Sequence, residues 1–415
     1  MSIPAEPAPA ATIAETAPAP SVWKAPGFRT LATAWVFTNL GDSALYLMAA
    51  VWVKELTGSD VQAALVFVCL GIPALLAPFL GLLADRVSRK LLVVVTNAVL
   101  VPVVLSLLLV RTPAQVWIVY AVILAYGAAG YLTAAAQSGI IRSMLRDDQL
   151  AVGNGTLSTI DNAFRLIAPL IGTGLYVALG PHAVVIMTAS VFGIAAVIFS
   201  ALPVARQAPK REQDAGGIVR ELVAGFAQLW RVGDLRMLTI AVVIAFGATG
   251  LLNVIVFPLL DGLGVDPAMI GVLVPIQGAG AVVGGILSAK IVTTLGEARA
   301  AALGMALLGL GTAFFLVPMF TLAVVGMVVM GLGIPVAAVA FVTLRQRVTP
   351  DHLQGRTAAA GNVAFNLPQT ALSVAGAGLL AIVDYRLLLA ATVIAVAAGA
   401  VLALRVRRRS EAAAA

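Results

Sequence analysis

Long apolar runs separated by short charged or Gly- and Pro-containing breaks dominate the chain. The runs are about 18 to 28 residues long, which suits helices that cross about 30 Å of hydrocarbon. They cover 30–53, 61–84, 91–110, 114–140, 152–179, 183–203, 237–260, 268–289, 300–317, 320–344, 358–382 and 387–404. The pattern predicts an all-α polytopic membrane protein with twelve transmembrane helices.

The longest break, 204–236, divides the runs into two groups of six. We expect it to be a cytoplasmic linker between two six-helix domains at 27–203 and 237–404. An Ala- and Pro-rich stretch at 1–26 predicts a disordered cytoplasmic tail, and a basic cytoplasmic tail follows at 405–415.

The linker contains one amphipathic segment. Four apolar residues recur there at helical spacing: Ile218, Leu222, Phe226 and Leu229. This spacing predicts a short helix on the cytoplasmic membrane surface, with a docking site for a regulator as the alternative.

The cations are distributed unequally between alternate breaks. Lys54, Arg111 and Arg386 lie on one side, Arg165 lies inside a run, and all other Lys and Arg lie on the opposite side. Because cytoplasmic loops carry an excess of Lys and Arg, both termini are expected in the cytoplasm. The net charge of +7 then reflects orientation, and no nucleic-acid partner is expected. With 61% hydrophobic and 11% charged residues, a soluble domain is excluded.

The break between the second and third runs carries a compact charged motif, GLLADRVSRK, at 81–90. Its charged groups cannot lie in hydrocarbon, so the chain leaves the membrane here. The stretch resembles the loop between helices 2 and 3 of the major facilitator superfamily, Gly-x-Leu-Ala-Asp-Arg-x-Gly-Arg-Lys, with Ser88 in place of the second glycine. A hairpin that only fixes topology is the alternative.

The resemblance implies a transporter whose two six-helix halves rock about a central cavity. It also implies a motif that helps to hold the halves together in one conformation, with Asp85 facing the start of the eleventh span. The residues of this motif are Gly81, Asp85, Arg86, Arg89, Lys90 and Arg356.

The two halves look like copies at an offset near 204 residues. The residues of the fifth run that correspond to Asn366, Gly376 and Gly378 of the eleventh are Asn162, Gly172 and Gly174. Two parallel six-span repeats place a substrate site between the halves, near the bilayer midplane.

Three ionisable groups lie inside the runs: Asp42 in the first, and Asp161 and Arg165 in the fifth. Such groups are costly in hydrocarbon, so each is a functional candidate. Asp42 is our candidate for proton coupling; capping a turn beside Gly41, or permanent pairing with Arg165, is the alternative. Asp161 and Arg165 are spaced for an ion pair on their own helix, and exchange of Arg165 between Asp161 and Asp42 is the other possibility.

The fifth run continues with Pro169, Gly172 and Gly174. These residues resemble a degraded Gly-Pro-x-x-Gly-Gly signature, which marks drug:proton antiporters within the superfamily; Ala168 and Thr173 depart from it. Ordinary packing of small residues between helices is the alternative.

Other polar residues at membrane depth are candidates for the substrate cavity. They are Asn39, Tyr46, Tyr126, Gln137, Asn253, Gln277, Asn362 and Asn366, with Tyr131 and Gln369 as further members. A mostly apolar cavity with scattered amides and tyrosines suits a bulky amphipathic molecule better than a sugar or a multiply charged anion.

The sequence contains no nucleotide-binding loop, Ser-His-Asp set or Cys/His cluster. We therefore expect no enzymatic activity, no cofactor and no metal. His182 and His352 are expected at the surface, and Cys69 in the core. The expected partners are a small-molecule substrate, protons and membrane lipid, and the chain is expected to be a monomer.

Within the superfamily, the chain resembles the bacterial branch of macrolide and tetracycline-type efflux proteins and siderophore exporters. The resemblance rests on the stretches 39–42 and 56–59 and on the paired loops around Asp148 and Asp351. It implies a proton-coupled exporter of amphipathic molecules in the bacterial inner membrane. A proton-symporting importer and a non-transporting receptor or assembly factor are the alternatives.

Overall fold

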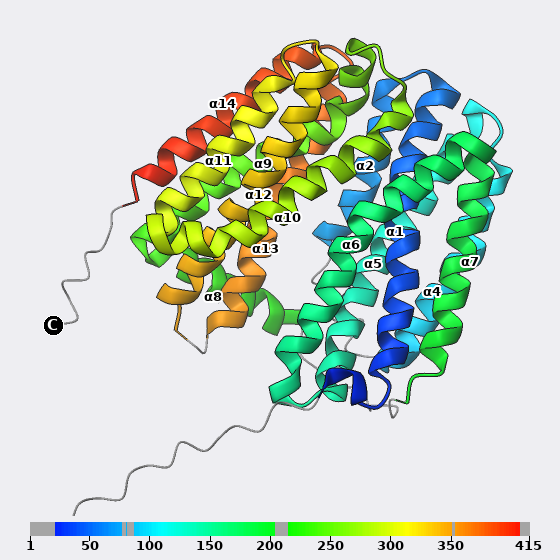
Figure 1. Ribbon diagram of the computed structural model, residues 1–415, viewed down its shortest axis with the longest axis horizontal. Helices are drawn as coiled ribbons and strands as arrows, with labels where there is room; N and C mark the ends of the chain where they lie inside the picture. Colours follow the sequence, from blue (N-terminus) through cyan, green and yellow to red (C-terminus); the bar gives the residue numbers. More distant parts are fainter. Residues whose placement is uncertain (1–20, 77–79, 81–86, 204–214, 351–352, 407–415) are drawn as a thin grey trace, which may run out of the picture.

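Helices make up almost all of the computed structural model, which describes residues 21–76, 80, 87–203, 215–350 and 353–406. Figure 1 shows them as two groups, here called the first and second halves. The first half contains α1 (Phe28–Thr57), α2 (Asp60–Leu75), α4 (Arg89–Leu105), α5 (Val116–Met144), α6 (Asp147–Leu179) and α7 (Pro181–Ser200). The second contains α9 (Gly233–Gly262), α10 (Ile270–Leu295), α11 (Glu297–Phe314), α12 (Phe320–Val348), α13 (Gln354–Leu379) and α14 (Tyr385–Leu404), and α8 (Ala215–Arg231) precedes it.

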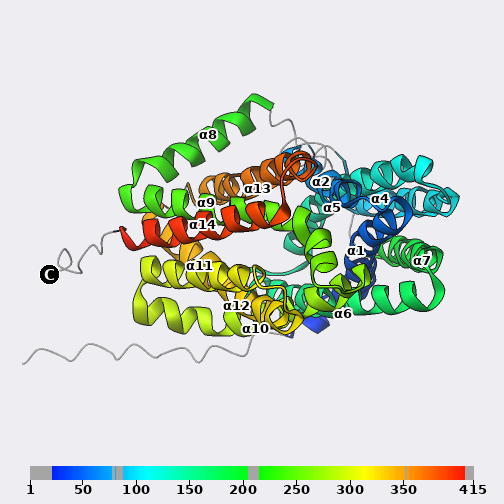
Figure 2. The same ribbon diagram turned by 90° about the horizontal axis from the view of Figure 1, so that it is seen from above.

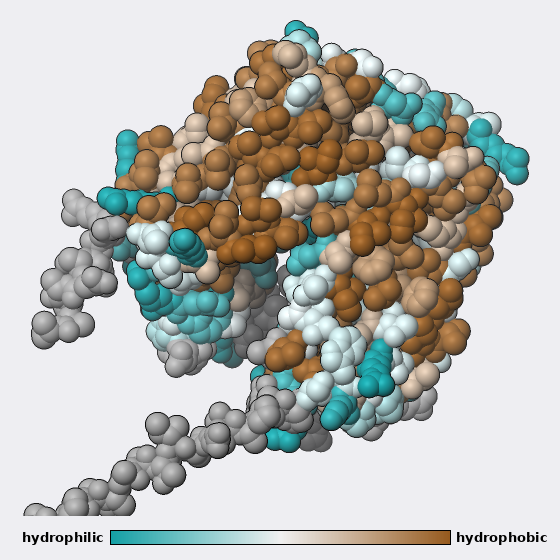
Figure 3. All heavy atoms as spheres, in the orientation of Figure 1, coloured by the Kyte–Doolittle hydropathy of each residue, from teal (hydrophilic) through white to brown (hydrophobic). Residues whose placement is uncertain are grey.

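Nine helices in the described part of the chain are long and apolar enough to cross a membrane: α1, α4 to α7, α9, α10, α12 and α14, some with a short 3-10 turn at one end. Apolar side chains cover much of the middle of the molecule, with polar ones toward the ends (Figure 3). The chain is therefore a multi-pass membrane protein. The expected runs at 300–317 and 358–382 coincide with α11 and α13, of which α13 carries several amides. Of the run at 61–84, α2 covers the part up to Leu75, and most of the remainder lies outside the described residues.

Corresponding helices pack against one another in each half. In the first half, α1 packs on α6 and α7, α4 on α5 and α7, and α2 on α5. In the second half, α9 packs on α13 and α14, α11 on α12 and α14, and α10 on α12. Helices at the same place in the order of each half therefore make the same contacts, and Figure 2 shows the two groups from above.

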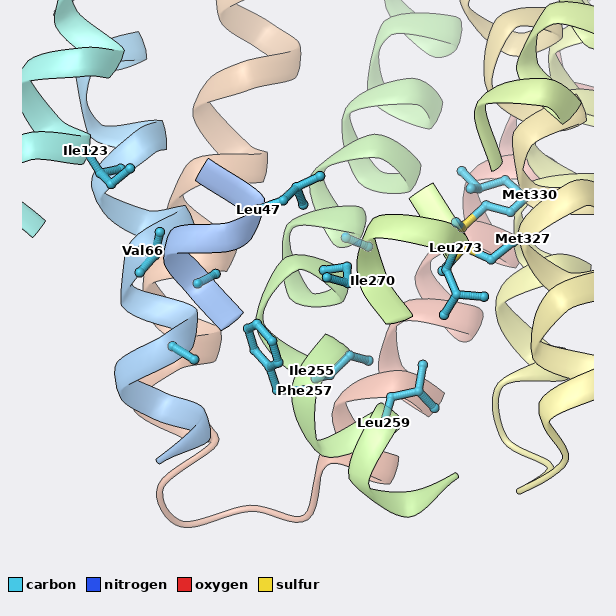
Figure 4. Packing of buried hydrophobic residues seen from close by; sticks show 14 of the residues in the cluster. Leu47, Val66, Ile123, Ile255, Phe257, Leu259, Ile270, Leu273, Met327 and Met330 are labelled. Atoms are coloured by element: carbon cyan, nitrogen blue, oxygen red, sulfur yellow. The ribbon is translucent and has the colours of Figure 1, made fainter. Parts of the chain in front are cut away.

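The halves meet through three main helix pairs, α6 with α10, α2 with α13 and α2 with α9. One apolar cluster includes Leu47 and Val66 of the first half and Phe257 and Ile270 of the second (Figure 4). We call the end of the bundle that holds the C-terminal ends of α1, α6 and α9 the Lys54 end. The opposite end, which holds α8 and the start of α1, is the α8 end (Figure 1).

The linker helix α8 packs on α13 and α9 of the second half. A Cβ at Gly225 would overlap the backbone carbonyl of Arg356, so the glycine permits this close approach. Leu229 is fully buried, whereas Val223 and Trp230 are exposed. The helix thus has one face attached to α13, and the side chain of Ile218 lies outside the described residues.

Two basic residues of the charged motif fix the start of α4 to neighbouring helices. Arg89 Nη1 donates to the Gly139 carbonyl of α5 at 3.1 Å, and Lys90 Nζ donates to the Leu202 carbonyl after α7 at 2.6 Å. The Leu202 carbonyl lies just after the C-terminus of α7, where a cation is favoured because the last carbonyls of a helix lack partners within it. Gly81, Asp85 and Arg86 lie outside the described residues.

Candidate functional site

A cavity of about 520 Å³ lies between the two halves, and we call it the central cavity. The first half contributes residues such as Tyr46, Phe67 and Tyr131, and the second contributes most of the polar groups. These second-half polar groups are Thr249, Asn253, Gln277, Asn366, Gln369, Thr370 and Ser373. No charged side chain is among its described lining residues, so the cavity suits a ligand with a large apolar part.

Part of the polar lining is fixed by hydrogen bonds between α9 and α13. Gln369 Nε2 donates to Thr249 Oγ1 at 3.0 Å, and Ser373 Oγ donates to the Gly250 carbonyl at 2.8 Å. Asn366, Thr370 and Ser373 are about one turn apart, so they share one face of α13. This spacing is visible in the sequence. From the sequence, however, only the amide side chains of α13 were identified as cavity candidates, and the hydroxyls of Thr370 and Ser373 were missed.

Asp42 lies on α1 beside the cavity rather than in its lining. The Tyr126 hydroxyl of α5 donates a hydrogen bond to its carboxylate, and Asp161 of α6 is close enough to interact with it electrostatically. Tyr46, one turn farther along α1, does line the cavity. The structure therefore brings together the two carboxylates singled out from the sequence.

The carboxylate of Asp161 accepts hydrogen bonds from two side chains of α1 that precede Asp42 in the sequence. Asn39 Nδ2 donates to Asp161 Oδ1 at 2.9 Å, and Trp35 Nε1 donates to the same oxygen. Asn39 also donates to the Trp35 carbonyl at 3.0 Å. Because Trp35, Asn39, Asp42 and Tyr46 recur at helical spacing, they form one polar stripe on α1.

Arg165 does not form either of the two expected ion pairs. Among the described residues, no salt bridge joins it to Asp161 or to Asp42. Its side chain is exposed, and it interacts electrostatically with Tyr46. Trp35 and Asn39 donate hydrogen bonds to Asp161 in place of Arg165. These contacts depend on how α1 is aligned along α6.

Four residues expected in the substrate cavity lie outside the lining of the central cavity. Asn39 and Tyr126 bind the two carboxylates instead. The backbone carbonyl of Asn362 accepts a hydrogen bond from Asn366 Nδ2 at 2.9 Å, and its side chain is exposed elsewhere on α13. Gln137 lines a second pocket. Membrane depth alone does not tell which face of a helix a polar side chain occupies.

This second pocket, of about 490 Å³, lies in the first half, and we call it the side groove. Its described lining comes from α1, α5 and α6 and includes Trp35, Gln137, Arg142, Ser158 and Asp161. Tyr131, Ala134, Gln137 and Ile141 follow one face of α5, from the central cavity to the side groove. The two pockets are therefore neighbours along this face.

The small residues of α6 mediate helix packing. A Cβ at Gly172 would lie 2.9 Å from Ala44 Cβ of α1, so the glycine permits the contact between α1 and α6. A Cβ at Gly271 of α10 would overlap the Thr173 hydroxyl, which donates to the Pro169 carbonyl at 2.8 Å. Gly174 has no atom within 4 Å of its Cβ position. The segment thus joins α6 both to α1 and to the second half.

An ion pair connects the halves at the Lys54 end. Lys54 Nζ lies 2.5 Å from Asp60 Oδ1 and 2.6 Å from Asp261 Oδ2 of the second half. Gly58, with φ of 66°, ends α1 just after Lys54 in a left-handed turn and donates its N–H to the Lys54 carbonyl. Nearby, the Tyr176 hydroxyl donates to Glu55 at 2.5 Å.

Of the two histidines expected at the surface, the structure describes only His182. His182 lies in the first turn of α7 and packs edge-on against Trp52, with ring centroids 5.7 Å apart. It is partly buried, because α7 begins against the end of α1, and His352 lies outside the described residues. Within the described part of the chain, no group of His, Cys, Asp or Glu is arranged to hold a metal.

A family model described as Major Facilitator Superfamily matches residues 31–370 and 238–415. The uncharacterized MFS-type transporter YfiS of Bacillus subtilis (strain 168) is 26% identical over 368 residues, which are 86% of this chain and 87% of that protein.

Solved structures of transporters share the fold. The nucleoside transporter NupG matches with a TM-score of 0.72 at 14% identity, over 91% of this chain and 98% of that one. A peptide transporter POT in complex with sulfate gives 0.71 at 14% identity, over 92% and 93%. A bacterial homologue of the iron transporter ferroportin, in an inward-facing state, gives 0.68 at 15% identity, over 94% and 100%.

Proposed function

Because the chain belongs to the major facilitator superfamily and is a transporter rather than an enzyme, we propose that it is a proton-coupled exporter of amphipathic small molecules, such as antibiotics or siderophores. One observation carries this proposal: a largely apolar cavity of about 520 Å³ between two helical halves, next to the carboxylates of Asp42 and Asp161. An apolar cavity binds the substrate, and a carboxylate beside it binds a proton.

The proposed cycle is alternating access by rocking of the halves. All twelve expected runs then cross the membrane as two six-helix repeats, which the matched helix pairs of the two halves support. With the α8 end in the cytoplasm of a bacterial cell, as the distribution of cations favours, the conformation is inward-facing. The hollow between the halves at the α8 end supports this assignment (Figure 3).

Asp42 is the proposed proton carrier. The Tyr126 hydroxyl and the nearby Asp161 carboxylate give it partners that respond to its charge. Protonation of Asp42 removes the repulsion between the two carboxylates, and the position of α1 relative to α5 and α6 can then change. This links proton binding to the helix that carries both Tyr46 in the cavity and Lys54 at the closed end.

Transport in everted membrane vesicles tests the proposal. An imposed proton gradient should drive accumulation of at least one member of a panel of antibiotics, dyes and siderophores, and substrate addition should release protons. Vesicles that carry the Asp42→Asn variant are the matched control. Substrate uptake without proton movement would show that transport is not coupled to protons. Proton-driven substrate movement out of the everted vesicles would identify an importer.

A further inference from the structure

The side groove is a defined pocket lined by side chains of three helices. It has a volume of about 490 Å³, close to that of the central cavity, and lies on the α8 side of it. Three helices line it: α1 with Trp35, α5 with Gln137 and Arg142, and α6 with Ser158 and Asp161. A ligand that enters from the α8 end and follows α5 reaches this groove before the central cavity.

Gln137 is a buried amide that faces the groove without a partner. Its side chain is only 7% exposed, and it makes no hydrogen bond within the described part of the chain. The amide is part of the lining of the groove and is reached by solvent there. A ligand that supplies a polar group can therefore form a hydrogen bond with Gln137 in place of water.

Asp161 offers one oxygen to the groove. Trp35 and Asn39 both donate to Oδ1, whereas Oδ2 accepts no hydrogen bond from any described residue. Since the two donors hold the carboxylate in place, Oδ2 is a fixed anionic acceptor at the deep end of the groove. Arg142 stands about five residues toward the α8 end on α5, and its side chain is exposed to solvent.

The corresponding region of the second half is filled by aromatic rings. Phe365 follows Asp161 by 204 residues, and Phe341 follows Gln137 by the same offset. The rings of Phe341 and Phe365 are in edge contact, with centroids 4.9 Å apart, and Phe246 packs against Phe365 at 6.0 Å. At these two positions the second half therefore has packed aromatic rings where the first half has Gln137 and Asp161.

We propose that the side groove is a second binding site, which selects amphipathic molecules that carry a protonated amine. The amine binds Asp161 Oδ2 and Gln137, and the apolar part lies against Leu150 and Leu157. An acidic ligand is rejected, because the partly buried Asp161 carboxylate repels it more than the solvated Arg142 attracts it. This proposal rests on the proposed transport function for its biological role, and it names the class of substrate.

Binding of two matched probes to the purified, full-length protein tests the site without any flux. The probes are 2-naphthylethylamine and 2-naphthylethanol, which share the ring and differ in charge, and their fluorescence anisotropy reports binding. The wild-type protein should bind the amine more tightly than the alcohol. Asp161→Asn should weaken amine binding by about ten-fold or more, because a charge-assisted hydrogen bond is lost, while alcohol binding changes little.

Two further variants locate the site. Gln137→Phe copies the aromatic residue of the second half, and it should abolish the preference for the amine by filling the groove. Asn362→Ala changes an exposed position of α13 outside the lining of both pockets and should leave that preference intact. Equal binding of both probes to the wild type, or an unchanged amine preference in both Asp161→Asn and Gln137→Phe, would overturn the proposal. Failure of transport with intact amine selectivity would contradict only the proposed function.

Discussion

At the scale of single residues, the charged and polar groups of α1 connect the main features of the first half. Trp35 and Asn39 hold Asp161, Asp42 accepts from Tyr126, and Tyr46 lines the central cavity. Helical spacing puts these side chains on one stripe, so a change of charge at Asp42 acts on a helix that reaches from the α8 end to Lys54.

Asp42→Asn should abolish proton-driven transport but preserve substrate binding. The amide keeps the size of the side chain and can still contact the Tyr126 hydroxyl, but it cannot take up a proton. Asp42→Glu should retain part of the coupling. Transport in vesicles and equilibrium binding of the same substrate, measured in parallel, check this prediction. Proton-driven transport at the wild-type rate would move the proton site to Asp161.

Trp35→Phe should weaken the link between α1 and α6. The ring remains, but the Nε1 donor to Asp161 is lost, which costs about 1.5–3 kcal/mol for a hydrogen bond to a charged group. Thermal unfolding in detergent should show a lower midpoint, and the drop should vanish in an Asp161→Leu background, which has no acceptor for Trp35 Nε1. A drop of equal size in both backgrounds would show that packing, not the hydrogen bond, is the cause.

The ionisable residues themselves could be found from the sequence, but their partners could not. Asp42, Asp161 and Arg165 were visible as charges within apolar runs. The contacts of Asp161 with Trp35 and Asn39 depend on which face of α1 meets α6, and the bond from Tyr126 depends on how α5 approaches α1. Similarly, Gln137 was recognised as a polar residue at membrane depth, but its separate groove depends on the packing of three helices.

At the scale of helices, close packing through glycine holds the second half together. A Cβ at Gly284 of α10 would lie 2.9 Å from Leu332 Cα of α12, and backbone cannot move aside as a flexible side chain can. The neighbouring Gly285 has nothing within 4 Å of its Cβ position. The two positions form a matched pair on one helix.

Gly284→Ala should destabilise the protein by about 1–3 kcal/mol, the usual cost of overpacking. Gly285→Ala should be neutral or slightly stabilising, since alanine favours the helix. Midpoints of thermal unfolding in the same detergent compare the two variants directly. Equal midpoints would show that α10 and α12 do not depend on this close contact.

The approximate positions of the helices could be predicted from the sequence, because each long apolar run is bounded by charged or Gly- and Pro-containing residues. The sequence also suggested that the halves are related, which agrees with their matched helix pairs. The attachment of α8 to α13 was not foreseen. The apolar stripe that includes Phe226 and Leu229 was visible, but an apolar stripe alone does not tell whether it faces the membrane surface or another helix.

At the scale of the whole molecule, the described helices of the two halves meet at the Lys54 end and stand apart at the α8 end (Figures 1 and 3). Lys54 is only 12% exposed and pairs with Asp261 across the halves, whereas the Asp261 side chain is 45% exposed. Solvent therefore screens the pair, and its contribution to the closed conformation should be no more than about 1 kcal/mol.

Asp261→Asn should move the population modestly toward opening at the Lys54 end. The change should be about five-fold or less in the ratio of the two conformations, as expected for a screened pair. Cysteine labelling near Lys54 should become faster. Asp60→Asn is the control, since it removes the partner of Lys54 on its own half and should have a smaller effect. Identical labelling rates in wild type and Asp261→Asn would show that the ion pair does not hold this end closed.

Alternating access through the central cavity is best tested by two distances measured between spin labels. With Cys69 replaced by Ser, one pair is placed at Ser143 and Gln346 on the α8 end, and another at Ala178 and Val317 on the opposite end. Across changes of pH and of substrate concentration, the first distance should shorten whenever the second lengthens. Distances that stay fixed, or that increase together, would contradict alternating access.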